Sequence, residues 1–256
     1  MMKRLGIVKS LQMAMLVVCA ALAGCHCSHN KLTAVTQVKL GTHAAVTPVE
    51  LPYDWWQDRH AAILDRVKQG NVGIILIGDS ITHGWETDGK ETWDKYYAPR
   101  NAVNMGFSGD QTQHVLWRLE HGEISGISPK LAVVMIGTNN SGGDGYTAQQ
   151  IAEGILAIVQ KLRADLPNTK VLLLAIFPRG EKTNSQRDKN AEASLIASKI
   201  ADNRMVFYKD INSIFLTQDG TLIKDVMPDF LHPNAKGYEL EAVAIEPTIV
   251  KLMGEK

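Results

Sequence analysis

A serine, a histidine and an aspartate in this chain of 256 residues have the spacing that ester-cleaving chemistry needs. A serine attacks an ester when a base removes its proton, a third group orients that base, and donors stabilise the developing oxyanion. Ser80 is the candidate nucleophile and His232 the candidate base. Asp229 precedes His232 by three residues, so one turn of chain brings its carboxylate to the imidazole and fixes the tautomer. Asp225 is an alternative carboxylate that lacks this spacing.

Candidate donors for the oxyanion occur in the same polar stretches. We expect three of them: the backbone N–H of Ser80, the unobstructed N–H of Gly106 and the side-chain amide of Asn139. Asn140 takes the place of Asn139 if the register is shifted by one residue. Three further residues are candidate substrate contacts: Thr138, Trp85 and Arg179.

The same residues also suit purely structural roles. Asp79 and Ser80 are favourable at the N-cap of a helix that follows a strand. Asn139 suits a turn, and Gly106 suits a backbone position with positive φ. Because each residue alone has such an explanation, the functional interpretation depends on their occurring together and in order.

Cysteines and histidines give no support to other chemistries. All three cysteines lie at or before Cys27, so the domain that follows has no disulfide, thiol nucleophile or thiolate metal site. No two histidines have the spacing His-X-His or His-X3-His, so we expect no metal and no cofactor. Three tryptophans are interpreted as packing residues rather than as a platform for a sugar: Trp55, Trp56 and Trp117.

Short apolar runs alternate with longer amphipathic segments, and this alternation must position the polar stretches. Buried parallel strands are apolar on both faces, and the crossovers between them are usually helices. We therefore predict one three-layer α/β/α domain with a five-stranded parallel sheet, whose loops at the carboxyl ends of the strands carry the site. The predicted strands are Val72–Ile77, Ala102–Met105, Leu131–Ile136, Val171–Ile176 and Met205–Tyr208, and the predicted helices are Asp54–Gln69, Gln111–His121, Thr147–Leu166, Gln186–Ala201 and Ala235–Met253.

The first residues have the pattern of an export signal. Three basic residues precede the apolar run Leu11–Ala23, which is too short to span a bilayer. The run ends in Leu22–Cys25, which resembles the lipobox of bacterial lipoproteins and implies cleavage before Cys25 and lipidation of its thiol. We expect a signal peptide at residues 1–24, a lipidated tether at 25–50 and the esterase domain at 51–256.

The four polar stretches together resemble those of the SGNH (GDSL) hydrolase superfamily. They read GDSIT around Ser80, NMG ending at Gly106, GTNN around Asn139 and DFLH ending at His232, within a region from about residue 72 to 238. The segments NMGFSGDQTQHVLWRLEHGEI and DFLHPNAKGY more closely resemble catalytic subunits of intracellular platelet-activating-factor acetylhydrolase. That resemblance implies a flavodoxin-like sheet, removal of small acyl groups, chiefly acetyl, by the Ser/Asp/His set, and pairing as a homodimer.

These features predict a serine esterase that removes acetyl groups through an acyl-enzyme, with acetylated carbohydrate as the expected substrate. The alternatives are a lysophospholipase or thioesterase for longer acyl chains, and a catalytically silent lipoprotein that binds glycans. The net charge of zero gives no sign of a nucleic-acid partner. The lipobox predicts anchoring in a bacterial envelope, and His26 after the cysteine favours the outer membrane.

Overall fold

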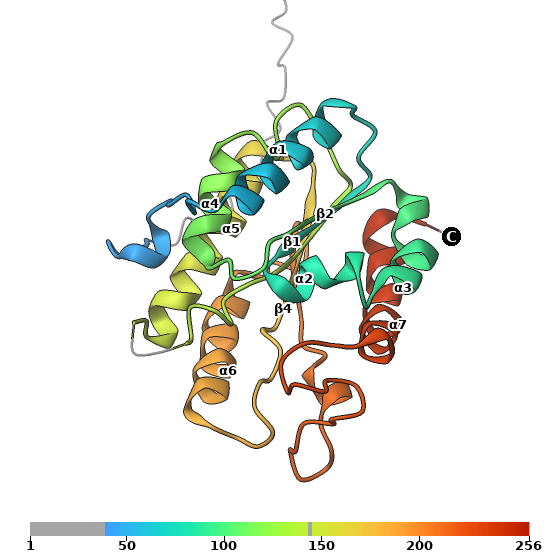
Figure 1. Ribbon diagram of the computed structural model, residues 1–256. Helices are drawn as coiled ribbons and strands as arrows, with labels where there is room; N and C mark the ends of the chain where they lie inside the picture. Colours follow the sequence, from blue (N-terminus) through green and yellow to red (C-terminus); the bar gives the residue numbers. More distant parts are fainter. Residues whose placement is uncertain (1–38, 143–144, 256) are drawn as a thin grey trace, which may run out of the picture. The chain divides into compact units, whose positions relative to one another are not determined.

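The computed structural model describes residues 39–142 and 145–255, which belong to one compact unit. Its centre is a parallel five-stranded sheet with the strand order β2-β1-β3-β4-β5 (Figure 1). The predicted α/β architecture is therefore confirmed, with strand ends that differ from prediction by one or two residues. The strands are β1 Ile74–Gly78, β2 Ala102–Gly106, β3 Leu131–Met135, β4 Lys170–Leu174 and β5 Val206–Lys209.

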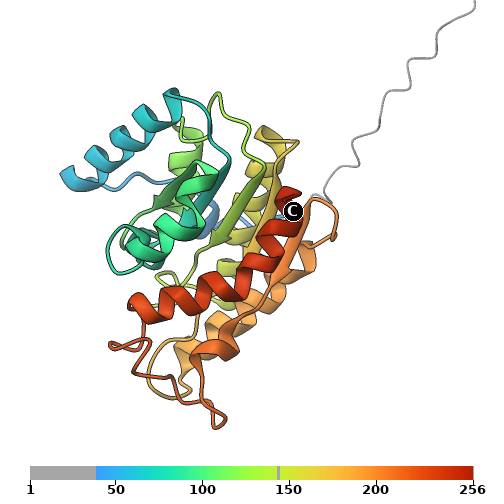
Figure 2. The ribbon, with the colours of Figure 1, turned by 90° about the vertical axis from the view of Figure 1, so that its right-hand side faces the viewer.

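Helices cover both faces of the sheet. One face carries α1 (Asp54–Lys68), α4 (Thr112–Glu120), α5 (Ala148–Asp165) and α6 (Ser185–Ala197). The other face carries α2 (Ser80–His83), α3 (Lys90–Tyr96) and α7 (Ala235–Met253), and Figure 2 shows α7, in red, lying across it. Single turns of 3-10 helix complete the chain: η1 Ala44–Val46, η2 Gly84–Glu86, η3 Ala98–Arg100, η4 Ser198–Ile200 and η5 Asn212–Phe215.

Side chains of the central strands alternate between two apolar cores. In β1, Ile75 and Ile77 join the core beneath α1, α4 and α5, whereas Ile74 and Leu76 join the core beneath α7. All five residues of this strand are buried. Because both faces are covered, the strand is a continuous apolar run that leaves its polar residues at the carboxyl end.

Part of the predicted tether is folded against the domain. The carbonyl of Ala45 accepts a hydrogen bond from Thr112 Oγ1 at 2.8 Å, and His43 Nε2 lies 2.8 Å from a Glu153 carboxylate oxygen. A Cβ on Gly154 would lie 2.4 Å from Thr112 Oγ1, so a glycine on α5 permits this close approach. The last part of the tether predicted at 25–50 therefore contacts the domain through His43 and Ala45.

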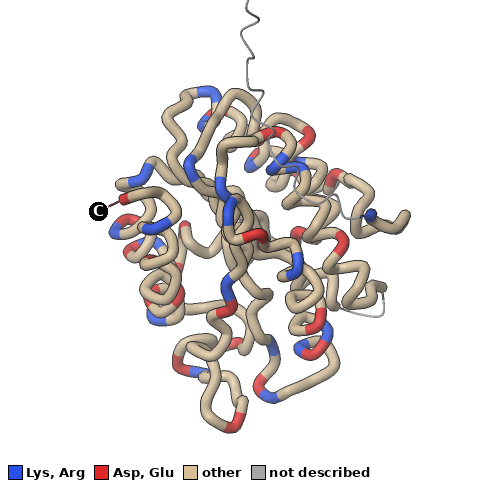
Figure 3. Tube along the Cα trace, turned by 180° about the vertical axis from the view of Figure 1, so that it is seen from behind, with Lys and Arg blue, Asp and Glu red and all other residues tan. Residues whose placement is uncertain are grey.

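The predicted signal peptide and the lipidation of Cys25 lie outside the described residues and stay predictions. Within the ranges that the structure describes, no helix is both long and apolar enough to cross a membrane. Lys and Arg are interspersed with Asp and Glu along these ranges (Figure 3).

Candidate active site

A sharp strand-to-helix turn presents Ser80 at the carboxyl edge of the sheet. Ser80 follows the end of β1 by two residues and begins α2, which Asp79 caps by accepting a hydrogen bond from the Ile81 N–H at 3.0 Å. A Cβ on Gly78 would lie 2.1 Å from Thr82 Oγ1, so only glycine lets the helix fold back so closely. Burial raises the pKa of Asp79 to about 7, although the Ile81 N–H opposes the shift. This aspartate has a capping role beside the nucleophile.

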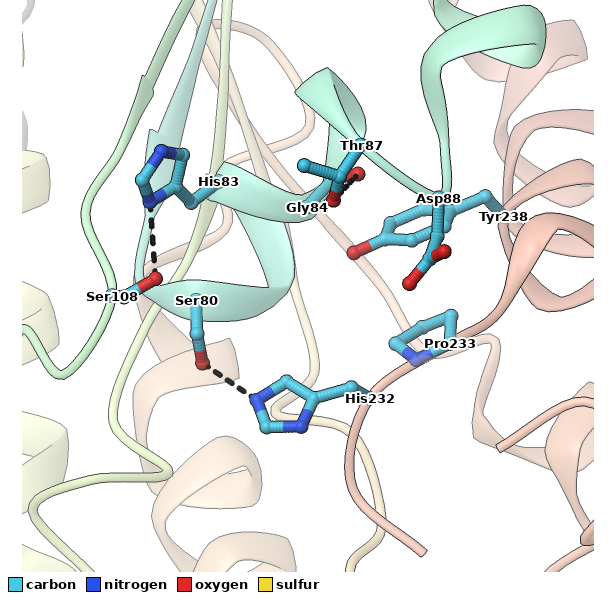
Figure 4. Close-up of a pocket in the computed structure, with 9 residues that line it drawn as sticks. All are labelled: Ser80, His83, Gly84, Thr87, Asp88, Ser108, His232, Pro233 and Tyr238. Carbon is cyan, nitrogen blue, oxygen red and sulfur yellow. Dashed lines mark hydrogen bonds between the residues drawn. The ribbon is translucent and has the colours of Figure 1, made fainter. Parts of the chain in front are cut away.

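Three predicted catalytic side chains meet here. Ser80 Oγ lies 2.9 Å from His232 Nε2 (Figure 4), and His232 Nδ1 lies 2.6 Å from Asp229 Oδ2. The second Asp229 oxygen accepts the backbone N–H groups of Leu231 and His232 at 3.0 and 2.8 Å. Phe230 has a φ of 58°, a left-handed conformation uncommon outside glycine, which closes this tight turn. Two hydrogen bonds from backbone N–H groups therefore hold the Asp229 carboxylate beside the imidazole of His232.

The electrostatics of the pair fix the proton positions. Burial raises the pKa of Asp229, but hydrogen bonds from the His232 side chain and backbone outweigh it, so the pKa lies below its ordinary value. The carboxylate is therefore ionised at neutral pH and accepts the proton on His232 Nδ1. This tautomer leaves Nε2 free to accept the proton of the Ser80 hydroxyl.

Gly106 does not have the free N–H that the sequence predicts. Its N–H donates to the Asn104 side-chain oxygen at 2.9 Å, inside the protein, and the Asn104 amide donates to Thr82 O at 2.9 Å. A Cβ on Gly106 would lie 2.3 Å from the backbone nitrogen of His83. Gly106 therefore lets α2 pack against β2, and its assignment as an oxyanion donor is wrong.

Gly109, three residues later, has the properties expected of that donor. The Asp110 N–H bonds to Phe107 O at 3.1 Å, and Gly109 has a φ of 81°, as at the third position of a type II turn. Gly109 is exposed, with no heavy atom within 4 Å of where a Cβ would be. Its peptide is therefore presented at the surface of the turn that follows β2.

Asn139 lies against the same turn. Its side-chain amide donates one hydrogen bond to the carbonyl of Asp110 at 2.9 Å, and an amide carries a second N–H that a ligand can use. Asn140 is fully buried and bonds instead to the backbone N–H of Thr112 at 3.0 Å and to Gln113 Oε1 at 3.1 Å. The alternative register is thus excluded, because the Asn140 side chain is used in holding α4.

A buried polar network anchors the turn from below. Asp110 accepts hydrogen bonds from Trp56 Nε1 at 2.7 Å and from Arg118 Nε at 2.9 Å. Arg118 also pairs with Glu123, which lies 3.1 Å from His60 Nδ1. Burial raises the pKa of Asp110 to about 6, although the Arg118 charge opposes it. This network joins α1 and α4 to the residue whose carbonyl holds Asn139.

The predicted substrate contacts do not face the site. Trp85 is 1% exposed and packs on Tyr97 and Tyr238, at ring-centre distances of 5.0 and 4.5 Å. Thr138 is also 1% exposed, and Arg179 Nη1 donates to its carbonyl and its hydroxyl at 3.1 and 3.2 Å. These predictions are therefore wrong for Trp85 and Thr138, because the Trp85 ring packs in the core and the Thr138 hydroxyl accepts a hydrogen bond from Arg179. The half-buried Arg179 braces the loop after β3 and does not line the pocket described next.

A pocket of about 260 Å³ opens beside Ser80 and His232 (Figure 4), with polar and apolar groups in its walls. Sequence reasoning missed His83 and Asp88 there, although both lie within eight residues of the nucleophile. In the described ranges no cluster of three or more His, Cys, Asp or Glu residues is arranged to hold a metal ion. The lining residues are Ser80, His83, Gly84, Thr87, Asp88, Ser108, His232, Pro233 and Tyr238.

Comparisons with known proteins point to one family. Residues 76–240 match the GDSL-like lipase/acylhydrolase family. Platelet-activating factor acetylhydrolase IB subunit alpha1 of Homo sapiens is 35% identical over 201 residues, which cover 78% of this chain and 85% of that protein. A structure from Streptococcus pneumonia, provisionally described as a platelet activating factor, is 23% identical, with a TM-score of 0.62 over 77% of this chain and 95% of its own. An acetylxylan esterase from Geobacillus stearothermophilus shares the fold at 18% identity, with a TM-score of 0.55 over 73% of this chain and 97% of its own.

Proposed function

The chain belongs to the GDSL-like lipase/acylhydrolase family, and we propose that it is a serine esterase that removes acetyl groups from carbohydrate. The observation that carries this proposal is the continuous relay from Ser80 through His232 to Asp229 at the wall of a small pocket. As a member of the family, the chain is a carboxylic ester hydrolase. The acyl group and the alcohol are the parts that we propose.

The first half-reaction forms an acyl-enzyme. Ser80 Oγ attacks the ester carbonyl while its proton passes to His232 Nε2, and Asp229 stabilises the imidazolium that results. The tetrahedral intermediate collapses with cleavage of the bond between the carbonyl carbon and the alcohol oxygen. His232 returns the proton to that oxygen, and the alcohol leaves.

The second half-reaction releases the acid. His232 removes a proton from water, the resulting hydroxide attacks the acyl carbonyl, and Ser80 Oγ departs with the proton returned from His232. The proposed oxyanion donors are the N–H groups of Ser80 and Gly109 and the side-chain amide of Asn139. Loss of one such donor typically lowers turnover by about 10²–10³-fold.

An acetyl group is favoured by the relatives and by the pocket. The curated relatives are named acetylhydrolases, and the human protein is 35% identical over most of its length. The pocket beside Ser80 has a volume of only about 260 Å³, with many polar groups in its walls. Such walls suit a polar alcohol better than a long acyl chain, because polar groups that face hydrocarbon lose their hydrogen bonds to water.

Hydrolysis of a graded series of p-nitrophenyl esters tests the acyl group. We expect the highest kcat/KM for acetate, with a steady fall through butyrate and octanoate to palmitate. A preference for octanoate or palmitate would instead favour a lysophospholipase or thioesterase. A second comparison tests the alcohol part of the ester. We expect faster acetate release from acetylated xylan than from an acetylated phospholipid.

We also propose that Cys25 carries lipid and anchors the enzyme in the outer membrane of a bacterial envelope, and that two copies pair as a homodimer. The lipobox at Leu22–Cys25 supports the anchor. Incorporation of labelled fatty acid that is lost in Cys25→Ser, followed by membrane fractionation, tests it. Sedimentation of the purified chain tests the dimer.

A further inference from the structure

Two adjacent tryptophans at the start of α1 have opposite surroundings. Trp56 is fully buried and donates to Asp110, whereas Trp55 is 44% exposed. The Trp55 ring lies nearly parallel to the ring of His83, with an angle of 15° and a ring-centre distance of 6.5 Å. One face of a large aromatic ring therefore stays available next to a residue that lines the pocket.

His83 connects this tryptophan to the nucleophile. His83 Nδ1 lies 3.0 Å from Ser108 Oγ (Figure 4), and both residues line the pocket with Ser80. Burial and the nearby charge of Arg59 lower the pKa of His83, although Glu86 opposes them. The imidazole is therefore neutral at neutral pH, and its second ring nitrogen, Nε2, faces Glu86 Oε2 at a distance of 3.9 Å.

Asp88 supplies a carboxylate on the opposite wall. The residue is exposed and lines the same pocket, and Figure 4 shows its carboxylate between Tyr238 and Pro233. No cation in the described ranges forms an ion pair with Asp88. Its two oxygens can therefore accept hydrogen bonds from neighbouring hydroxyl groups of one ligand.

This combination suits a sugar ring better than a lipid. One face of a pyranose carries C–H groups that stack on an aromatic ring, while its hydroxyls need donors and acceptors around the edge. Pro233 and the ring of Tyr238 supply apolar surface in the pocket, and the Tyr238 hydroxyl donates to Ile81 O at 2.7 Å. A sugar ring can offer hydroxyl donors to Asp88 as well as C–H groups to such surface, whereas a hydrocarbon chain offers no donor.

We propose that this pocket is the subsite for the sugar ring that bears the ester, with Asp88 as its hydroxyl anchor and with Trp55, which stacks on His83 in the pocket wall, as the adjoining aromatic platform. The inference rests on the proposed function, since Ser80 lines the same pocket and receives the acetyl group.

The test compares kcat/KM of the purified full chain for an acetylated xylo-oligosaccharide and for ethyl acetate, which has no ring to stack. We expect Trp55→Ala and Asp88→Ala each to lower the ratio of the two values by about tenfold. Trp55→Phe should restore most of this ratio, because a smaller aromatic ring still stacks.

The matched controls are Tyr53→Ala and Asp94→Ala. Tyr53 is an aromatic residue that is 55% exposed and outside the pocket, and Asp94 is an exposed acid on α3. Both should leave the ratio unchanged.

Binding to a Ser80→Ala chain separates the subsite from the catalysis. We expect calorimetry to detect binding of the xylo-oligosaccharide, weakened about tenfold by Trp55→Ala or Asp88→Ala. Unchanged ratios and unchanged binding in both variants would overturn the subsite and leave the esterase standing. If the unaltered chain fails to hydrolyse ethyl acetate, p-nitrophenyl acetate and the acetylated sugar, the proposed function fails, and the binding measurement still decides on the subsite.

Discussion

At the scale of single residues, the Asp229–His232 pair determines whether Ser80 can react. The carboxylate is held by two backbone N–H groups and by the imidazole, so its orientation does not depend on distant packing. Its lowered pKa keeps it ionised at neutral pH, which favours a proton on His232 Nδ1. Asp229 therefore orients His232 rather than accepting its proton.

Replacing Asp229 by Asn tests that role. The amide can present a donor to His232 Nδ1 and stabilise the wrong tautomer, so we expect kcat for p-nitrophenyl acetate to fall by about 10⁴-fold. Asp225→Asn is the matched control, because Asp225 lies in the same loop but pairs with Lys236 on the surface. Equal losses in the two variants, or none in Asp229→Asn, would contradict the assignment.

Asn139 and Asn140 form a second contrasting pair. Asn139→Ala should lower kcat by about 10²–10³-fold while the free energy of unfolding changes little. Asn140→Ala should lower the free energy of unfolding by about 1–3 kcal/mol, since it leaves buried groups of Thr112 and Gln113 without partners. Kinetics and urea denaturation of both variants check this, and a reversal of the two effects would assign the donor to Asn140.

At the scale of elements, α4 and α7 each carry a buried ionisable side chain that the apolar cores must accommodate. Arg118 of α4 is fully buried between Asp110 and Glu123. Glu241 of α7 is 3% exposed, and its Oε2 has no hydrogen-bond partner in the described ranges. Arg118 is a charge with carboxylate partners, whereas burial keeps Glu241 protonated, so the two helices should respond differently to substitution.

Arg118→Met should be strongly destabilising. It leaves two buried carboxylates without their cation, which typically costs about 3–5 kcal/mol. Lys90→Met is the control, because the Lys90–Asp94 pair is more than half exposed at both ends and contributes about 0–1 kcal/mol. Urea denaturation at pH 8 measures both, and a loss below about 1 kcal/mol in Arg118→Met would show that the network does not hold the turn.

Glu241 should make stability depend on pH. Burial raises its pKa from 4.5 to about 8, so the folded chain keeps a proton that the unfolded chain releases. The free energy of unfolding therefore falls as pH rises from about 4.5 to 8. Glu241→Gln should remove the contribution of Glu241 to this decrease in the free energy of unfolding. Glu239 is exposed on the same helix, so Glu239→Gln should leave the decrease unchanged. Parallel slopes for all three proteins would contradict the assignment.

The sequence predicts some elements well and others poorly, for identifiable reasons. Strands β1 and β3 are buried on both faces and consist of continuous apolar runs, whereas Asn104 interrupts β2 and Lys170 begins β4. Helix α3 has only seven residues, too few for a periodic pattern, and it packs through Trp93 on Trp85. The interpretation of Trp55 as a packing residue is wrong, because Trp56, His60 and Ile63 form the inward face of α1 and leave Trp55 44% exposed.

The glycines at the end of β2 and in the turn that follows it show what the sequence cannot supply. Gly106 ends β2 and Gly109 comes three residues later, and either glycine could present its N–H to the site. In the folded chain the Asn104 side chain accepts the Gly106 N–H, which leaves Gly109 in the exposed turn. The Asn104 side chain also donates to Thr82 O on α2, a contact between distant parts of the chain that no local pattern encodes.

At the scale of the whole molecule, the fold gathers residues from distant parts of the chain at one edge of the sheet. Ser80 follows β1, Gly109 follows β2, Asn139 follows β3, and His232 comes from the loop before α7. The matched family region, residues 76–240, includes all four. Residues 39–50 pack behind α4 and α5, so the segment leading into the domain is part of its structure.

The most direct test of the account is the trapping of an acetyl group on Ser80. The purified chain is mixed with p-nitrophenyl acetate, quenched within the first turnover and analysed by peptide mass spectrometry, with Ser80→Ala alongside. We expect a burst of about one p-nitrophenol per chain, an acetyl group on the peptide that contains Ser80, and neither in the variant. Turnover by Ser80→Ala at the rate of the unaltered chain, or an acetyl group on another residue, would contradict it.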